Sequence, residues 1–431
     1  MLLLQAKRSR RLIKEGSWIV LGQLMMIAGS LVGVRLLTEL LSPDAYGQLA
    51  LGMTIATLVN QIVLGPLGGG IIRFYAHAVE SSDLAGYFNA AKKMTLLATG
   101  VIFLIILFSS VGLIVAEKIK WLGITISALV FATLSGYCAN FSGIQTAARQ
   151  RAIVAMHQGA EPLLRSLIAA GLLIWLGATS TIAMIGYVIA SLFVLASQGF
   201  FFRKIYPVNT FSDKKNNWQD KIWKFSWPIG IFGVFTWLQL ASDRWALQTF
   251  SSTSEVGSYA VLYQIGYYPI SLLSGMAMQF LVPILYQRSG DASDNERNAA
   301  ANKLSWQLTW VTLIITMTAV LVAFMLHKLI FQILVAQKYS SVSHLLPWMI
   351  LSGGMFAAGQ SLASNLQAKL KTRELMAAKI ITALSGVAFN FIGAYWYGIT
   401  GIVCAGLLFS IMFLLWMALL VNRESEGVCF C

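Results

Sequence analysis

The sequence predicts an all-α protein that crosses a membrane about twelve times. Of its 431 residues, 57% are hydrophobic and only 11% are charged, and the mean hydropathy is +0.71. Because a soluble domain carries roughly 25% charged residues, this composition excludes an ordinary soluble protein. The net charge of +14 would suggest nucleic-acid binding in a soluble chain. Here the basic residues lie between apolar runs, so we expect no nucleic-acid partner.

The apolar runs themselves define the expected helices. A bilayer core about 30 Å thick needs about 20 apolar residues of helix, and the chain contains twelve runs of suitable length. In chain order they cover residues 17–40, 46–67, 93–115, 121–144, 156–177, 180–202, 225–247, 256–284, 304–326, 345–367, 375–397 and 400–421. Glycine and proline interrupt the second and eighth runs. An even number of runs places both termini on the same side of the membrane.

The positions of Lys and Arg predict which side that is, because cytoplasmic loops carry an excess of basic residues. With a cytoplasmic N-terminus, basic clusters such as "KRSRR" near the start and "KLKTR" near residue 370 fall inside. The loops then predicted to lie outside hold only Lys118, Lys120, Lys328 and Lys338. We therefore expect a multi-pass protein with both termini in the cytoplasm.

A polar connection halfway along the chain predicts two six-helix halves, residues 1–210 and 211–431. It reads "RKIYPVNTFSDKKNNWQDK" and covers residues 203–221. A weak internal repeat supports this division, because "YGQLALGMTI" opens the second run and "VGSYAVLYQI" opens the eighth. Parallel repeats with a site between them are common in transporters. No loop is large enough to form a domain, so any function must reside within or between the helices.

The deepest charged residues of the predicted spans are Glu161 and Arg165, four residues apart and so on one helix face. Counted from Gly177 at about 1.5 Å per residue, Arg165 lies about 18 Å below the outer end. An Arg near the midplane costs about 2.5–3.5 kcal/mol to insert. Two interpretations stay open. Glu161 forms an internal salt bridge that only lets the helix insert, or Arg165 also lines a wet cavity and binds an anionic substrate.

Two shallower pairs lie near predicted outer ends. Arg35 and Glu39 are four residues apart in the first run, and Asp243 and Arg244 are adjacent in the seventh. Both arginines are close enough to the interface to snorkel to it, which is the alternative to a role in substrate binding. Charged residues within spans often mark substrate and ion pathways, so we take Glu39, Glu161 and Asp243 as candidates for coupling or gating.

Arg73 is the fourth candidate for binding an anion. It follows the glycine-rich stretch "LGPLGGGII" at the predicted inner end of the second run, where a positive-inside anchor is the alternative. The glycines precede no Lys-Ser or Lys-Thr and so form no phosphate loop. The four His and four Cys show no metal-ligand spacing, and no set of residues suits covalent catalysis. We expect no metal, no cofactor and no enzymatic activity.

Three stretches of the chain resemble a known family. "RLLTELLSPDAYGQLAL" has an Arg, a short loop with Pro and an acidic residue, then Tyr-Gly and an apolar helix. It resembles the Wzx-type polysaccharide-biosynthesis (O-antigen) flippases of the multidrug/oligosaccharidyl-lipid/polysaccharide (MOP) exporter superfamily. "LGPLGGGIIRFYA" resembles the second helix of that family, and residues 224–265 resemble its seventh and eighth helices. In helix count, orientation and half-length the resemblance covers nearly the whole chain.

The resemblance implies two six-helix lobes packed as a V around a central cavity that opens alternately to either face of a bacterial inner membrane. It implies that a polyprenyl-pyrophosphate-linked oligosaccharide moves to the outer leaflet, with membrane lipids, a polysaccharide polymerase and chain-length proteins as partners. A cationic cavity with Arg35, Arg73, Arg165 and Arg244 would offset desolvation of the pyrophosphate. Two alternatives stay open: a cation-coupled multidrug exporter of the same superfamily, and a non-transporting scaffold of a glycan-assembly complex.

Overall fold

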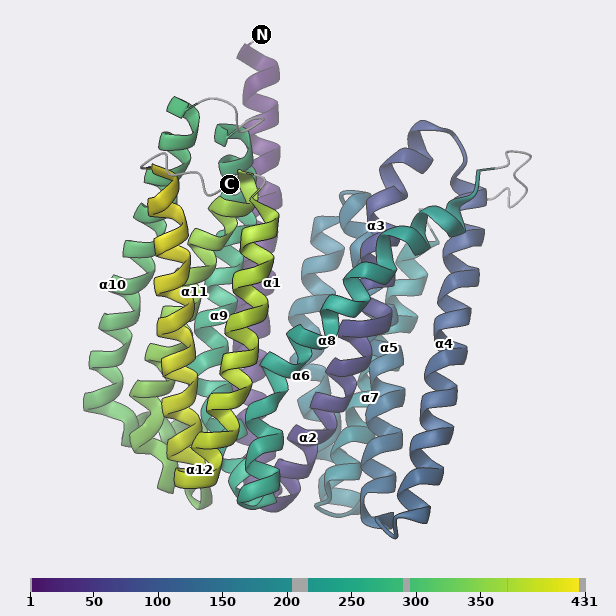
Figure 1. The fold of residues 1–431 in the computed structure, drawn as a ribbon. Coiled ribbons are helices and arrows are strands. Elements are labelled where there is room, and N and C mark those ends of the chain that lie inside the picture. The colour runs from purple at the N-terminus through teal and green to yellow at the C-terminus, as the bar shows by residue number, and fades with distance from the viewer. Residues whose placement is uncertain (1, 204–215, 290–294, 370, 426–431) are drawn as a thin grey trace. The chain divides into compact units, whose positions relative to one another are not determined.

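The computed structural model describes residues 2–203, 216–289, 295–369 and 371–425 (Figure 1). Within those ranges every regular element is a helix, which confirms the predicted fold class. Nine helical segments of the described residues are long and apolar enough to cross a membrane, and one of them, Arg373–Arg423, is long enough for two passes. The protein is therefore a multi-pass membrane protein.

The chain divides into two units, Met1–Trp237 and Leu238–Cys431. The boundary predicted between residues 210 and 211 lies outside the described residues and stays a prediction. The first unit contains α1 (Leu2–Leu40), α2 (Pro43–Val59), the π-helix η1 (Asn60–Leu64), α3 (Gly65–Glu80), α4 (Leu84–Val115), the 3-10 helix η2 (Ile119–Trp121), α5 (Leu122–Ala147), α6 (Arg151–Leu176), α7 (Ser180–Phe202) and the first part of α8 (Trp218–Phe250). The second unit contains the rest of α8, then α9 (Thr253–Ser289), α10 (Asn295–Leu334), the 3-10 helix η3 (Gln337–Leu345), α11 (Leu346–Ala368) and α12 (Thr372–Ser425).

The twelve apolar runs lie in helices, apart from Gly177 at the end of the fifth, and most of these helices extend beyond their runs. The seventh and eighth runs lie in α8 and α9, which are not among the nine described segments that are long and apolar enough to cross a membrane. The second run, predicted to end at residue 67, belongs to a helical segment that continues to Glu80. Inside it the N–H of Gly65 donates to the carbonyl of Asn60, an i→i+5 bond that defines η1. Membrane helices tolerate Gly and Pro within their length, so the Gly-Pro pair does not end this one. The last two runs lie in α12, which breaks at Gly398 with φ 54°, a conformation that glycine adopts readily.

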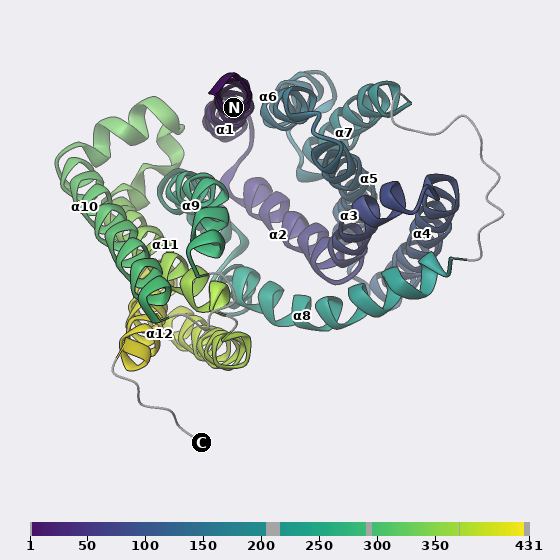
Figure 2. The same ribbon diagram turned by 90° about the horizontal axis from the view of Figure 1, so that it is seen from above.

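In the first unit, α5 packs against α2, α3, α4 and α7, and α1 lies along α6 (Figure 2). Small residues allow the contact between α1 and α6. A Cβ added at Gly22 would lie 2.9 Å from the carbonyl oxygen of Ala155, and one at Gly29 would lie 3.0 Å from the nitrogen of Leu163. Small residues let membrane helices approach closely. This packing holds α1 against the helix that carries Glu161 and Arg165.

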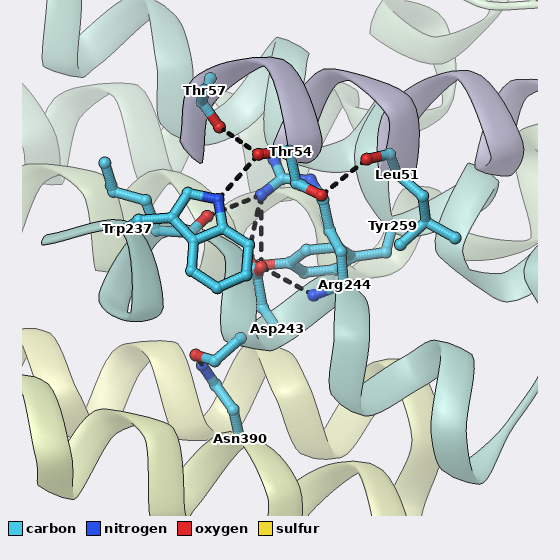
Figure 3. Close-up of polar contacts among 10 residues, drawn as sticks. Leu51, Thr54, Thr57, Trp237, Asp243, Arg244, Tyr259 and Asn390 are labelled. Carbon is cyan, nitrogen blue, oxygen red and sulfur yellow. Dashed lines mark hydrogen bonds and ion pairs between the residues drawn. The ribbon is translucent and has the colours of Figure 1, made fainter. Parts of the chain in front are cut away.

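The beginning of α8 is held on the first unit by the turn between α3 and α4. Asp83 in that turn is 2% exposed. Its carboxylate accepts hydrogen bonds from the indole N–H of Trp218 at 2.7 Å and from the side-chain amide of Asn216 at 2.9 Å. Further along α8, the indole N–H of Trp237 donates to the carbonyl of Thr54 at 2.7 Å (Figure 3). These bonds join segments far apart in the sequence.

Replacing Asp83 by Ala is expected to destabilise the protein by about 1–3 kcal/mol, because the buried donor of Trp218 would lose its acceptor. Thermal unfolding of the purified protein would show this as a lower Tm. Asp220→Ala is the matched control, since Asp220 pairs with Lys224 at 2.8 Å while their side chains are 43% and 72% exposed. Exposed ion pairs contribute little. Equal shifts in Tm for both variants would contradict the anchoring role of Asp83.

Candidate functional site

The deepest candidate residues meet on α6. Glu161 Oε1 lies 3.9 Å from Arg165 Nε, and the two side chains are 20% and 23% exposed. The ion pair expected from their spacing is therefore present. It is a long contact, and it uses only one of the three guanidinium nitrogens.

Two aromatic rings hold the guanidinium of Arg165. Its Cζ lies 5.6 Å from the ring centroid of Phe131 on α5 and 5.6 Å from that of Tyr187 on α7. Cations are attracted to such ring faces within about 6 Å. Within the described parts of the chain, the terminal nitrogens Nη1 and Nη2 have no hydrogen-bond partner. A guanidinium fork with free nitrogens can donate two parallel hydrogen bonds to a phosphate or carboxylate.

The second charged pair is more fully enclosed. The side chains of Asp243 and Arg244 are 9% and 13% exposed. The Oδ1 atom of Asp243 accepts from the backbone N–H of Arg244 at 2.7 Å and from its Nη1 at 3.2 Å. Oδ2 accepts from the hydroxyl of Tyr259 at 2.7 Å (Figure 3). The same Nη1 also donates to the carbonyl of Leu240 at 2.9 Å.

Tyrosines of α9 complete the surroundings of Arg244. Tyr259, Tyr263 and Tyr267 are spaced by four residues and share one helix face. The Cζ of Arg244 lies 4.6 Å from the ring centroid of Tyr263 and 5.9 Å from that of Tyr259. The rings of Tyr263 and Tyr267 stack with centroids 4.8 Å apart. Arg244 is thus held by its own carboxylate and by aromatic rings, and it is less free than Arg165 to bind an anion.

A small cavity of about 60 Å³, lined by both polar and apolar side chains, adjoins this cluster within the second unit. Its lining includes Asp243, Tyr259, Tyr263, Tyr267, Ser352, Asn390 and Ser410. The hydroxyls of Ser352 and Ser410 lie 3.1 Å apart, and the Asn390 amide donates to the hydroxyl of Ser242 at 2.8 Å. A space of this volume that several polar groups face has room for a few water molecules. Asp243 therefore lines a cavity that can hold water.

The remaining candidates are Arg35, Glu39 and Arg73. Arg35 Nη2 lies 3.3 Å from Glu39 Oε2, with side chains 43% and 60% exposed. Arg73 is exposed on α3, and it makes no hydrogen bond or ion pair to the described residues. The structure thus brings each of the three candidate coupling acids together with one candidate binding arginine, and it leaves Arg73 without an acid.

Sequence reasoning missed the aromatic residues of both centres as site residues. Tyr263 and Tyr267 could have been found from their spacing after Tyr259. Phe131 and Tyr187 are ordinary members of apolar runs and give no such signal. Among the described residues, no three His, Cys, Asp or Glu side chains lie close enough together to bind a metal ion.

Comparison with known proteins agrees with this fold. Among solved structures, the lipid II flippase MurJ in an inward closed conformation has a TM-score of 0.72 at 14% identity, covering 95% of this chain and 87% of MurJ. A mutant of the Vibrio cholerae MATE transporter VcmN has a TM-score of 0.60 at 14% identity, covering 98% of each chain. An inward-facing multidrug resistance MATE family transporter of the MOP superfamily has a TM-score of 0.61 at 15% identity, covering 96% of each chain. At these identities the likeness shows the fold alone.

Sequence comparison identifies the family. No protein of curated function matches the chain. Residues 12–288, more than half of the chain, match the family described as polysaccharide biosynthesis protein. The helical architecture is that of the MurJ and MATE transporters. The chain therefore belongs to the polysaccharide biosynthesis protein family and has the flippase-like fold of the MOP superfamily.

Proposed function

We propose that this protein is a flippase that moves a polyprenyl-pyrophosphate-linked oligosaccharide from the cytoplasmic to the outer leaflet of a bacterial inner membrane, with both of its termini in the cytoplasm. The observation that carries the proposal is the free guanidinium fork of Arg165, clamped between Phe131 and Tyr187 on a membrane-spanning helix. A pyrophosphate presents oxygens that match this fork. The family's part in polysaccharide biosynthesis supports a glycan as the rest of the cargo.

Binding would exchange one anionic partner of Arg165 for another. In the structure, Glu161 neutralises the guanidinium at 3.9 Å. When phosphate oxygens bind the Nη edge, the phosphate repels the neighbouring carboxylate, and protonation of Glu161 relieves that repulsion. Two ligands that change each other's affinity in this way are thermodynamically coupled. Substrate binding and proton uptake would therefore favour each other.

The other charged residues have separate roles in this proposal. Arg73, exposed and without an acid, is a further cation that can meet a phosphate. Arg35 with Glu39 and Asp243 with Arg244 act as gates whose ion pairs open and re-form during the cycle. Because Arg244 is held by hydrogen bonds to Asp243 and Leu240 and by the ring of Tyr263, it would contact the substrate only after those contacts rearrange.

The test uses cells that lack the gene, labelled with radioactive sugar and extracted for lipids. We expect a polyprenyl-pyrophosphate oligosaccharide to accumulate facing the cytoplasm, and a wild-type copy of the gene to clear it. No accumulation together with normal surface glycan would overturn the proposal. Increased sensitivity to cationic drugs would then indicate the multidrug exporter. If variants that lack the charged side chains of the membrane spans export the glycan normally, the result would indicate a non-transporting scaffold of a glycan-assembly complex.

A further inference from the structure

Buried polar side chains continue from the Glu161–Arg165 pair toward the predicted cytoplasmic ends of α5 and α7. Each of them is at most 5% exposed. They are Cys138, Ser142 and Gln145 on α5 and Ser191 and Gln198 on α7, and we call them the polar track. The spacings of four, three and seven residues keep each set on one side of its helix.

Two contacts join the two sides of the polar track. The side-chain amide of Gln198 donates to the hydroxyl of Ser142 at 2.9 Å. The thiol of Cys138 donates to the backbone carbonyl of Ser191 at 3.7 Å. The polar faces of α5 and α7 are therefore turned toward each other along the track, rather than toward lipid.

The two ends of the polar track lead to different places. At the deep end, Cys138 and Ser191 lie seven and four residues after Phe131 and Tyr187, the two rings that contact Arg165, and so on the same helix faces as those rings. At the other end, the backbone N–H of Gln150 donates to the carbonyl of Gln145 at 2.8 Å. Gln150 is partly exposed in the short turn that connects α5 to α6. The track thus runs from the ion pair to the surface on the predicted cytoplasmic side.

Several polar atoms of the track are buried without a partner among the described residues. They are the hydroxyl oxygen of Ser191, Oε1 of Gln198 and both side-chain amide atoms of Gln145. Beside the surface end of the track, Oε1 of Gln150 is likewise buried without a partner. Leaving such an atom unsatisfied costs about 1–3 kcal/mol, and native proteins usually satisfy it with ordered water. The amide nitrogen of Gln145 only donates and the amide oxygens only accept. Water suits both kinds of atom, whereas a cation would be repelled by the donor.

We propose that a row of water molecules fills the polar track and carries protons between the cytoplasm and Glu161. A proton entering at Gln150 passes from water to water along hydrogen bonds. The last water transfers it to the Glu161 carboxylate, which becomes a neutral carboxylic acid, and no group is oxidised or reduced. This inference rests on the proposed function, in which a phosphate displaces Glu161 from Arg165. Proton relays of polar residues within spans have this role in transporters.

The surroundings of Glu161 make it the acceptor at the end of the track. The neighbouring titratable or charged groups are Arg165 and His157 on α6, Cys138 on α5 and Tyr187 on α7. His157 is bound to the hydroxyl of Ser197 at 2.9 Å. The part of α1 that packs on α6 carries no charged residue from 17 to 34. None of these neighbours is a second carboxylate.

The test measures flipping of the lipid-linked oligosaccharide in proteoliposomes with and without an imposed pH gradient that is acidic on the cytoplasmic face of the protein, the side from which the proton is proposed to enter. Gln145→Leu and Gln198→Leu keep similar side-chain volumes but remove the polar atoms. We expect both to reduce the stimulation by the gradient at least about tenfold, since proton transfer by positioned groups is worth on the order of 10²–10⁴-fold. Gln248→Leu is the matched control, because Gln248 on α8 also has a buried unpartnered Oε1 outside the track. Gln145→His retains a donor and an acceptor and should keep the stimulation.

The outcomes separate the polar track from the flippase itself. Two results would contradict proton transfer along the polar track without contradicting flippase activity. One is normal stimulation in both leucine variants, and the other is wild-type flipping that does not respond to the pH gradient. Absence of any flipping by wild-type protein would instead contradict the proposed function. Radiolytic hydroxyl labelling of the wild-type protein tests the water directly and does not depend on a folded variant. Cys138, only 3% exposed, should be oxidised by radicals formed from adjacent water, and an unmodified Cys138 would overturn the proposal.

Discussion

Replacing Arg165 by Gln is expected to abolish export of the lipid-linked oligosaccharide while the protein still reaches the membrane. Glutamine keeps much of the length and polarity of the side chain but removes the charge and the guanidinium fork. Hydrogen bonds to charged groups are worth about 1.5–3 kcal/mol each, so losing two of them corresponds to a loss of rate on the order of 10²- to 10⁴-fold. The partner left behind, Glu161, is only 20% exposed and would lose its counter-charge as well.

The measurement is the accumulation of radiolabelled lipid in cells whose own gene is deleted, with the abundance of each variant in the membrane determined by immunoblot. Arg165→Lys keeps the charge without the fork and should give intermediate export. Arg35→Gln is a useful comparison, because the pair formed by Arg35 and Glu39 is exposed and its loss should have a smaller effect. Wild-type export by Arg165→Gln would remove Arg165 from the binding site.

The second large effect is expected at Asp243. Asp243→Ala should destabilise the protein by about 3–5 kcal/mol, because breaking a buried ion pair leaves an uncompensated charge on its partner. That partner, Arg244, is only 13% exposed, and the hydroxyl of Tyr259 would also lose its acceptor. Thermal unfolding in detergent would report the change. Glu39→Ala, which removes an exposed pair, should cost about 0–1 kcal/mol.

A double variant makes the reason for this loss testable. Combining Asp243→Ala with Arg244→Met removes both charges, so no unpaired ion remains buried, and much of the stability should return. If the double variant is no more stable than Asp243→Ala alone, the stability depends on packing around Asp243 and not on its charge. Asp243→Asn should be intermediate, because its amide oxygen can still accept from Tyr259.

Much of the fold was predictable, because a lipid bilayer restricts the solutions. In a bilayer, the backbone N–H and C=O groups must form their hydrogen bonds within the chain, so a long apolar run is expected to be a helix. The extent of the second helix was not predictable in the same way. Gly65 and Pro66 indicate an end in a soluble protein, whereas here the π-helix η1 precedes them and α3 continues to Glu80.

The site was predictable only where its partners are close in sequence. The contact of Glu161 with Arg165 follows from helical geometry, and so does the common face of Tyr259 and Tyr263. By contrast, Phe131 and Tyr187 reach Arg165 from other helices, and apolar spacing alone does not determine which helices pack together. The roles of Arg35, Arg73, Arg165 and Arg244 in binding, and of Glu39, Glu161 and Asp243 in coupling, remain predictions for the experiments above.

The π-helix Asn60–Leu64 has a consequence for the direction in which Arg73 points. A π-helical turn adds about one residue to an α-helix, and each residue of an α-helix turns the chain by about 100° about its axis, since 3.6 residues complete a turn. Each side chain of α3 therefore points in a direction rotated by about 100° around the helix axis, compared with its direction in an unbroken α-helix. A chain shorter by one residue in this segment would turn Arg73 away from the exposed side of α3 that it now occupies. Arg73 makes no hydrogen bond or ion pair to the described residues, so its direction follows from the register and packing of α3.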